Sequence, residues 1–406
     1  MKTILATAYA INPYKGSEDG MGWNFVMQIA RFNRVIAVTR ENNRPHIEKY
    51  MQENPSELYK NTTFLYFDTP YWTRFWKKGG RGAMFYYLMW QRMVISFIRD
   101  KEIDFDIVHN LNFHNDWSPS FLWKLGKPFV WGPIGHHPLI PSAYLAPYSK
   151  KYLVKDRFTW LIKKLFWNFS GTLRKAITKA DFIWAMNPSV KDVVAIDQKE
   201  HVISASVATQ DFGWKEKLQS NSFSLMSVGR LVPLKGFDLT IRSFASFVNS
   251  LSESERSNVH LKIVGSGPEE NFLKKITEDE GITDYVTFIS WIERSDVMEL
   301  FRNSSAFLFP SHEGAGMVVP EALSFGVPVI TLDNEGPGGF ITPECGIAVK
   351  SSSYEDTVHH LAESIRSLYQ KPPMLRKMRK AARKRFVDYF HWDRRGEQLK
   401  SIYAKL

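Results

Sequence analysis

The sequence predicts an α/β protein with two doubly wound domains, each a parallel sheet covered by helices on both faces. Three observations support this class. Short apolar runs alternate with stretches of helical periodicity in both halves of the chain. Glycine, proline or polar residues follow most of these runs and mark loops. The length of 406 residues corresponds to two domains of about 200 residues each.

The second half shows the alternation most clearly. Its apolar runs predict strands over Phe223–Val228, Leu261–Val264, Val286–Ile289, Ala306–Phe309 and Val327–Thr331. The segments between them predict helices over Gly236–Val248, from Pro268 to a Gly281 cap, over Asp296–Asn303 and over Val318–Ser324. Strands joined through helices in this way pair in parallel.

The first half follows the same rhythm with longer insertions. The strands expected there are Thr3–Ala8, Val35–Val38, Phe64–Phe67, Ile107–His109, Phe129–Trp131, Asp181–Ala185 and His201–Ser204, with a helix over Trp23–Phe32. A loop-like stretch near residues 206–222 separates the two patterns. We therefore expect domains at 1–205 and 206–385, and a C-terminal helix at 386–406 that packs back on the first domain.

Composition limits the class of protein. Hydrophobic residues make up 44% of the chain and charged residues 23%, which indicates a globular protein and excludes a disordered one. Cys345 is the only cysteine, which excludes an intrachain disulfide and a cysteine-based metal site and favours a reducing compartment. The N-terminus does not read as a signal peptide, and no apolar stretch reaches 18 residues. We expect a cytoplasmic protein.

The net charge of +11 is unevenly distributed. Residues 1–200 contain 28 Lys and Arg against 17 Asp and Glu, whereas residues 201–406 contain 25 of each. Two stretches of the basic half, 71–93 and 148–169, combine lysine and arginine with aromatic residues. In the second, Trp160, Lys163, Lys164 and Trp167 have the spacing of a helix that lies on an anionic membrane. A buried helix with lysines at its rim fits the same pattern. We expect peripheral contact with the inner face of the cell membrane.

The most informative segment is 310–330, PSHEGAGMVVPEALSFGVPVI. It follows the end of an expected strand, where ligands of open α/β sheets bind. Glycines in the loop allow close approach of the backbone, and the helix after them presents amide groups that suit a phosphate. Glu313 and Glu321, with seven residues between them, suit hydroxyl groups on either side of that phosphate. A nucleotide sugar has this layout.

Two cations follow another expected strand end, in SVGRLVPLKGFD. Arg230 and Lys235 there can clamp a diphosphate and stabilise the charge of a leaving group. For an isolated Arg and Lys, an ordinary surface position is the simpler explanation. The neighbouring segment 310–321 favours the explanation that both cations bind a diphosphate.

Four motifs, SVGRLVPLKGFD, VGSGPEE, VTFISWIERSDVMELF and HEGAGMVVPEALSFGVPVI, occur in this order within about residues 220–350. Together they resemble the C-terminal domain of the GT-B retaining glycosyltransferases of family 4 (glycosyltransferase group 1). The resemblance implies two Rossmann-like domains facing a central cleft and a UDP- or GDP-sugar donor on the C-terminal domain. It also implies retention at the anomeric carbon, with no cofactor and no metal.

The resemblance implies a role for each residue that matches its pattern. Arg230 and Lys235 would contact the donor diphosphate, Glu313 the sugar hydroxyls and Glu321 the ribose. The further donor-binding residues it implies are Gly265, Ile292, Gly314, Ala315, Gly316, Met317 and Val318. Ala315 stands where the family commonly has phenylalanine, a departure expected to alter the sugar pocket.

The segments GSEDGMGWN and PFVWGPIG extend the resemblance, more weakly, into the first half. They imply that Gly16 and Ser17 lie near the donor and Glu18 near the acceptor. An ordinary helix start capped by Ser17 or Asp19 fits the same residues.

Histidines follow two expected strands of the first half, and the family often has a histidine here that contacts the donor sugar. Either His109 or His114 could make that contact, because the spacing of the loop is unusual. We take His109 as the catalytic candidate, and His114, Asp116 and His136 as candidates on the acceptor side. A histidine at a strand end also serves structural purposes, and no carboxylate spacing supports a histidine metal site.

These observations predict a hexosyltransferase of cell-surface polysaccharide biosynthesis that moves a sugar from a nucleotide sugar to a glycan or lipid-linked glycan acceptor. A sugar-nucleotide epimerase or phosphorylase on the same fold remains an alternative. So do a silent sugar-nucleotide sensor and a basic nucleic-acid-binding protein. Because no nucleic-acid-binding motif occurs, we expect no nucleic-acid partner.

Overall fold

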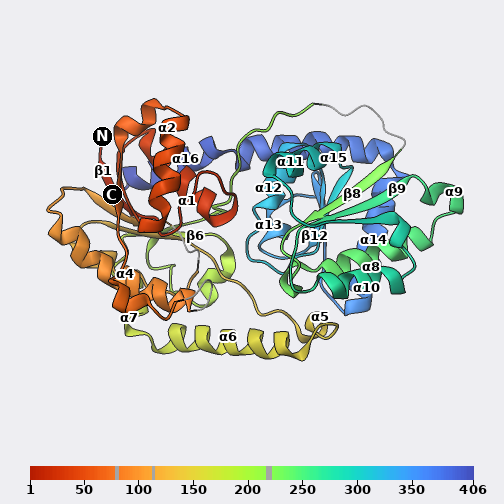
Figure 1. Ribbon diagram of the computed structural model, residues 1–406, viewed down its shortest axis with the longest axis horizontal. Helices are drawn as coiled ribbons and strands as arrows, with labels where there is room; N and C mark the ends of the chain where they lie inside the picture. The colour runs from red at the N-terminus through yellow and green to blue at the C-terminus, as the bar shows by residue number, and fades with distance from the viewer. Residues whose placement is uncertain (78–81, 112–114, 216–221) are drawn as a thin grey trace. The chain divides into compact units, whose positions relative to one another are not determined.

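The computed structural model describes residues 1–77, 82–111, 115–215 and 222–406. The chain divides into two compact units. The first contains residues 1–136, 161–206 and 392–406, and the second contains residues 137–160 and 207–391. Figure 1 shows that each unit is a sheet with helices on both faces, which confirms the predicted fold class.

In the described part of the first unit, seven parallel strands form a sheet in the order β3-β2-β1-β4-β5-β6-β7. The strands are β1 Thr3–Thr7, β2 Arg34–Thr39, β3 Thr62–Tyr66, β4 Ile107–Asn110, β5 Phe129–Ile134, β6 Phe182–Ala185 and β7 Glu200–Ile203. Its main helices are α1 Ser17–Ala30, α2 Arg44–Glu53, α3 Tyr71–Arg74, α4 Ala83–Asp100 and α7 Gly171–Lys179. In Figure 1, α1 and α2 cover one face of the sheet and α4 and α7 the other.

In the described part of the second unit, six parallel strands follow the order β10-β9-β8-β11-β12-β13. They are β8 Phe223–Val228, β9 Val259–Val264, β10 Val286–Ile289, β11 Ala306–Phe309, β12 Val329–Leu332 and β13 Gly346–Val349. The helices are α8 Phe237–Asn249, α9 Glu253–Arg256, α10 Glu270–Asp279, α11 Arg294–Asn303, α12 Val318–Ser324, α13 Pro337–Phe340, α14 Tyr354–Gln370 and α15 Pro372–Arg385. In Figure 1, α8, α10 and α14 cover one face, and α11, α12 and α15 the other.

The segment 137–160 packs on the second unit, although the sequence-based division placed it in the first domain. Tyrosine hydroxyls within and after α5 (Ser142–Leu145) hold it there. Tyr148 donates a hydrogen bond of 2.6 Å to Asp238, a buried residue of α8, and Tyr152 donates one of 2.6 Å to Glu269. Tyr144 lies within the hydrophobic core of the second unit, with its hydroxyl 2.8 Å from that of Thr357. Distant partners of this kind leave no local signal in the sequence.

The end of the chain packs in the first unit. A π-helical turn, Phe386–Phe390, follows α15, and α16 (Trp392–Ala404) then packs against α1. Arg31, which directly follows α1, lies 2.6 Å from Asp393. Gly396 lies at the contact, where a Cβ would lie 2.3 Å from the side-chain oxygen of Gln28 and would make that side chain shift.

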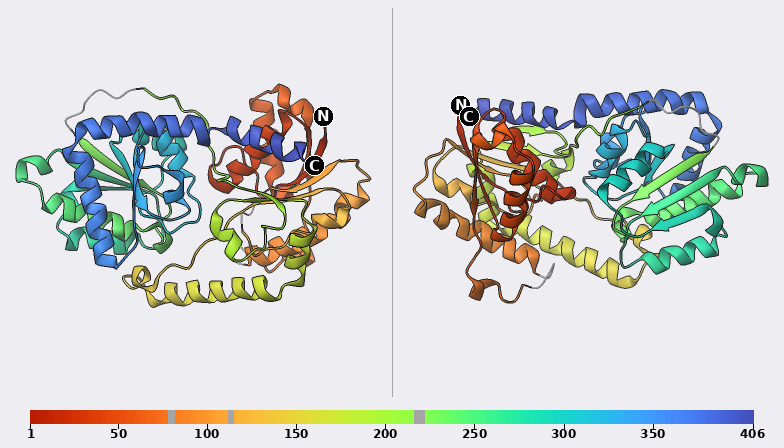
Figure 2. Two further views of the ribbon diagram at one scale, coloured as in Figure 1. Left: turned by 180° about the vertical axis from the view of Figure 1, so that it is seen from behind. Right: turned by 45° about the horizontal axis from the view of Figure 1, so that its top comes forward.

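The helix α6 (Lys150–Phe169) begins in the second unit and ends in the first, and Figure 2 shows it as one continuous helix. Among the residues that the structure describes, no helix is both long enough and apolar enough to cross a bilayer.

Candidate functional site

Lys235 and Glu313, predicted separately as a phosphate ligand and a sugar ligand, meet in the second unit. Lys235 Nζ lies 2.7 Å from Glu313 Oε2, and both side chains are less than one-fifth exposed. The lysine ends the short turn after β8, and the glutamate lies in the loop after β11, so both are at the carboxyl edge of the sheet. Lys235 Nζ also lies 5.2 Å from the centre of the Phe309 ring. The cation is therefore held in place between an anion and an aromatic face.

Backbone contacts fix these two loops against each other. The amide of His312 donates to the carbonyl of Leu234 at 2.9 Å. Gly236 follows Lys235 with φ +67°, and a Cβ there would lie 2.1 Å from the carbonyl oxygen of Pro310. Only glycine meets both requirements, so Gly236 sets the approach of Lys235 to Glu313.

The loop after β11 is supported by side chains that the sequence reasoning did not single out. Asn334 Nδ2 donates to the carbonyl of Ser311 at 2.8 Å, and its Oδ1 accepts the amides of Gly336 and Gly338 at 3.1 Å. His137 Nδ1 accepts a hydrogen bond of 3.2 Å from the Gly314 amide. No local motif could have revealed this contact, because 177 residues separate the partners.

The predicted phosphate seat is the start of α12, which begins at Val318. Gly316 and Met317 lead into it, and Ala315 lies half-buried in the loop before them. The first amides of a helix have no acceptor within the helix, so this end suits an oxyanion. Gly316 packs tightly, since a Cβ there would lie 3.1 Å from the Pro337 ring.

Glu321, expected at a ribose, is almost completely buried in α12. Its Oε1 accepts a hydrogen bond of 2.5 Å from Arg294 Nη2 at the start of α11. Burial raises the pKa of the Glu321 carboxyl, and the charge of Arg294 opposes that rise. Within the described residues Oε2 makes no hydrogen bond, so one oxygen remains available to a ligand.

Arg230 and Ile292 lie at the same sheet edge. Arg230 is exposed just after β8, and the described residues place no carboxylate within 4.0 Å of it. Ile292 is half-buried in the loop after β10. Arg230 is therefore a cation open to an incoming anion.

Gly265 has a structural explanation. Its φ is +141°, and a Cβ would lie 1.9 Å from the carbonyl oxygen of Gly229. The glycine lets the loop after β9 pack on the loop after β8, where the Leu231 amide donates to Ser266 at 3.0 Å. The structure thus accounts for Gly265 without a ligand.

Gly16, Ser17 and Glu18 lie at the start of α1 in the first unit. Ser17 is exposed and has φ +57°, a left-handed conformation that costs a non-glycine residue about 1–3 kcal/mol. Its side chain makes no capping hydrogen bond, and the N-cap position belongs to Gly16. The ordinary capped helix start is therefore not what forms here.

The structure corrects the catalytic role expected for His109. Its side chain is fully buried at the end of β4, and both ring nitrogens have partners. Nε2 lies 2.7 Å from the carbonyl oxygen of Gly132, which can only accept, so Nε2 carries the proton. Nδ1 then accepts from the Tyr403 hydroxyl at 2.6 Å. Burial lowers the pKa of His109 to about 4. His109 therefore fastens α16 to the sheet, with both ring nitrogens engaged.

The structure brings two acceptor-side candidates together. His136 Nδ1 lies 2.7 Å from Asp116 Oδ2, and both side chains are buried. The His136 ring also packs on Trp167, with ring centres 5.3 Å apart. His114 lies outside the described residues.

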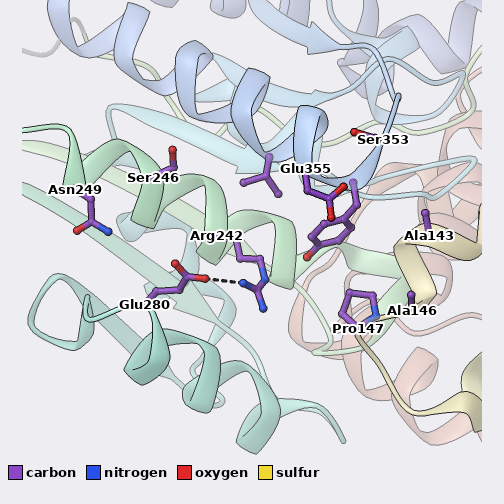
Figure 3. Close-up of a pocket in the computed structure, with 11 residues that line it drawn as sticks. Ala143, Ala146, Pro147, Arg242, Ser246, Asn249, Glu280, Ser353 and Glu355 are labelled. Atoms are coloured by element: carbon purple, nitrogen blue, oxygen red, sulfur yellow. Dashed lines mark hydrogen bonds and ion pairs between the residues drawn. The ribbon is translucent and has the colours of Figure 1, made fainter.

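A cavity of about 700 Å³ lies elsewhere in the second unit, beside α5, α8 and α14. Figure 3 shows Arg242 and Glu280 on one side of it, 2.6 Å apart, with Ala143, Ala146 and Pro147 facing them. None of its lining residues belongs to the loops after β8, β9 and β11. It is separate from the predicted donor site.

No cluster of three or more histidine, cysteine, aspartate or glutamate side chains that could hold a metal ion occurs among the residues with a described placement.

The fold is similar to that of solved structures with the GT-B fold. Sucrose-phosphate synthase from Thermosynechococcus elongatus aligns with a TM-score of 0.68 at 16% identity, covering 100% of this chain and 99% of that one. Anabaena Alr3699/HepE in complex with UDP aligns with a TM-score of 0.63 at 14% identity, covering all of both chains. At such low identity these likenesses concern the fold alone.

Sequence comparison adds a match to a family model within the second unit. Residues 209–385 match the family model of glycosyl transferases group 1, which confirms the resemblance carried by the four motifs. A GDP-mannose-dependent monoacylated alpha-(1-6)-phosphatidylinositol monomannoside mannosyltransferase from Corynebacterium glutamicum is 30% identical over 181 residues, 43% of this chain and 45% of the relative. The capsular polysaccharide biosynthesis glycosyltransferase CapM from Staphylococcus aureus is 30% identical over 189 residues, 46% and 47% of the two chains. The matches span about half the length of these relatives.

Proposed function

We propose that the protein is a retaining glycosyltransferase that moves a hexose from a UDP- or GDP-sugar to a glycan or lipid-linked glycan, without a metal ion. The observation that carries the proposal is the Lys235–Glu313 pair beside the start of α12. It brings the expected phosphate ligand next to the expected sugar ligand, in a loop that leads to a helix start whose first amides suit an oxyanion. A relative that uses GDP-mannose, another that acts in capsular polysaccharide biosynthesis and a similar structure that binds UDP support this choice.

The side chains of the site suit the reaction. The diphosphate would accept hydrogen bonds from Arg230, Lys235 and the first amides of α12. Lys235 would then bind the phosphate as well as Glu313. Glu313 could in turn accept hydrogen bonds from the sugar hydroxyls. Glu321 Oε2 would accept from the ribose while Arg294 holds Oε1.

Bond changes balance without a dedicated protein base. As the anomeric carbon loses its bond to the phosphate oxygen, it gains one to the acceptor oxygen on the same face. The leaving phosphate takes the acceptor proton. Arg230 and Lys235 stabilise the charge that develops on the phosphate. Removal of one such donor commonly lowers the rate of the reaction by about 100-fold or more.

The donor class is tested by thermal shift with UDP-, GDP- and ADP-sugars, since a ligand that binds the folded state raises its melting temperature. We expect a UDP- or GDP-sugar to stabilise the protein and Lys235→Ala to abolish the shift. A product assay with donor alone separates the alternatives, because an epimerase converts the donor without an acceptor. No shift with any nucleotide sugar would refute the proposal.

We also propose peripheral contact with an anionic membrane through α6. Five apolar side chains at helical spacing are 50–74% exposed and form one stripe along the helix: Val154, Phe158, Leu161, Leu165 and Phe169. Exposed lysines flank the stripe at positions 150, 151, 155 and 164. The lysines suit the negative charge of an anionic bilayer surface, and the apolar side chains suit the boundary between its headgroups and acyl chains.

This stripe differs from the face that the sequence singled out. Trp160 and Trp167 point to the opposite side of α6, where both are half-buried and Trp167 packs on His136. The tryptophans therefore anchor the helix to the protein, and the lysine-flanked aliphatic and phenylalanine side chains are those left exposed.

A further inference from the structure

A second cavity, of about 490 Å³, lies in the first unit and has an excess of positive charge. Among the described residues that line it, Arg40, Arg74 and Lys77 stand against one carboxylate, Asp68. Arg40 directly follows β2 and Asp68 comes two residues after β3. The cavity is therefore at the carboxyl edge of a parallel sheet, the edge at which open α/β sheets bind ligands.

The single carboxylate is already engaged. Asp68 accepts a hydrogen bond from the Tyr86 hydroxyl, and its other oxygen lies 3.5 Å from Arg74 Nη1. Within the described residues, no carboxylate lies within 4.0 Å of Arg40 or Lys77. Arg40 instead lies over the Tyr9 ring at 4.3 Å, and Lys77 Nζ lies 5.4 Å from the Tyr86 ring centre. Neither cation therefore forms an ion pair with a described residue.

Arg74, one of the residues that line the cavity, also carries an unmet hydrogen-bond donor. Arg74 Nε is buried and has no acceptor among the residues with a described placement. A buried donor without an acceptor costs about 1–3 kcal/mol, and an oxyanion in the cavity can supply the acceptor. Burial, reinforced by the charges of Arg40 and Arg74, lowers the pKa of Lys77, although the charge of Asp68 opposes that fall.

Aromatic rings stand at the rim. Tyr71 and Phe75 line the cavity and are 74% and 62% exposed, and Trp72 beside them is 75% exposed. Large exposed rings next to charged groups are typical of sites that take a ligand with both a flat apolar face and a polar group. A sugar ring that carries an acidic group has both.

We propose that this cavity binds the carboxylate or phosphate of an acidic sugar in the acceptor glycan. The inference rests on the proposed glycosyltransferase function, because it assigns the acidic group to the acceptor. Arg40 and Lys77 hold the acidic group, Arg74 Nε donates to it, and Tyr71 and Phe75 contact the face of the sugar.

The test is ligand-observed NMR titration of the full chain with glucuronate, glucose 6-phosphate, inorganic phosphate and glucose. We expect the two acidic sugars to bind in a saturable, salt-sensitive way and glucose to bind far more weakly. Equal affinity for glucose and the acidic sugars would overturn the proposal. Equal affinity for inorganic phosphate and glucose 6-phosphate would reject the sugar as part of the ligand.

Substitutions of cavity residues test whether the acidic sugars bind in this cavity. Lys77→Gln and Arg40→Gln should each weaken binding of the acidic sugars by about three- to tenfold, the loss expected for one partly exposed charged hydrogen bond. Lys175→Gln, an exposed lysine of α7 outside the cavity, should change nothing. Unchanged affinity in both cavity variants would contradict the assignment. Nucleotide-sugar binding measured in parallel separates the two proposals: if it persists while acidic sugars fail to bind, only the cavity assignment falls.

Discussion

Lys235 Nζ lies 2.7 Å from Glu313 Oε2, although 78 residues separate them in the chain. The pair joins the turn after β8 to the loop after β11 and places a cation and an anion side by side at the sheet edge. Both side chains are largely shielded, so removal of one leaves the other without its partner. This relationship links the predicted phosphate ligand to the predicted sugar ligand.

Removal of either cation should impair sugar transfer. We expect Arg230→Ala and Lys235→Ala each to lower kcat/KM by about 100-fold, or roughly 2.7 kcal/mol, because each would stabilise the leaving diphosphate. Lys274→Ala is the matched control, since Lys274 forms a comparable 2.7 Å pair with Glu270 at the protein surface. Steady-state kinetics decide, and rates within twofold of the parent for both variants would show that neither cation acts on the donor.

Glu321→Gln should separate stability from activity. Burial raises the pKa of Glu321, so the folded state binds its proton more tightly than the unfolded state does. Ionised Glu321 therefore lowers the free energy of unfolding. This loss is absent below the unfolded pKa of about 4.5 and grows as the pH rises above it. At pH 7.5 we expect Glu321→Gln to melt at or above the parent temperature while kcat/KM falls at least tenfold. Calorimetry and kinetics on the same samples measure both; full activity in the variant would remove Glu321 from the donor site.

His109 should make stability depend on pH in the acid range. Its pKa in the folded protein is about 4, below the usual 6.5, so the unfolded state takes up a proton first as the pH falls. The stability that depends on neutral His109 is fully present above pH 6.5. It is lost as the pH falls toward 4, and the free energy of unfolding then drops by roughly 3 kcal/mol at most. We expect His109→Gln to flatten this part of the profile and exposed His46→Gln to leave it unchanged.

If His109→Gln does not fold, Tyr403→Phe tests the same contact. It removes the hydroxyl that donates to His109 and should lower the free energy of unfolding by about 1 kcal/mol, with kcat/KM unchanged. A large loss of activity without loss of stability would return His109 to the list of catalytic groups.

The exposed stripe of α6 should bind anionic vesicles. We expect the protein to float with phosphatidylglycerol vesicles at low salt, less at high salt, and not with phosphatidylcholine alone. The double variant Phe158→Ser and Leu165→Ser should lose most of this binding, and Leu139→Ser, exposed elsewhere, should keep it. Failure of the parent to bind anionic vesicles would show that the stripe does not contact a membrane.

The sequence predicted much of the fold because strands and helices leave local patterns. β8, β10, β11 and α12 have the predicted bounds. β13, Gly346–Val349, was not predicted, since a four-residue strand that starts with glycine has little periodicity. Gly346 is nevertheless needed there, because a Cβ would lie 2.5 Å from the Val329 carbonyl oxygen.

The candidate site was predictable only where its residues lie in ordered motifs. Lys235 and Glu313 were found in this way, but their contact was not, because it depends on how two loops pack. Arg294 and His137 left no signal, since each acts through a partner far along the chain. His109 was misread because a strand-end histidine looks the same in sequence whether it faces a ligand or a helix such as α16.

The most direct test of the account is the anomeric configuration of the sugar that the protein releases. The protein is incubated with UDP-glucose, UDP-N-acetylglucosamine or GDP-mannose, and the first sugar or glycoside formed is followed by proton NMR, with Lys235→Ala as the control. The account predicts a product with the α configuration of the donor, formed by the parent protein and about 100-fold more slowly by the variant. A first product with the β configuration, or an equal rate in the variant, would contradict it.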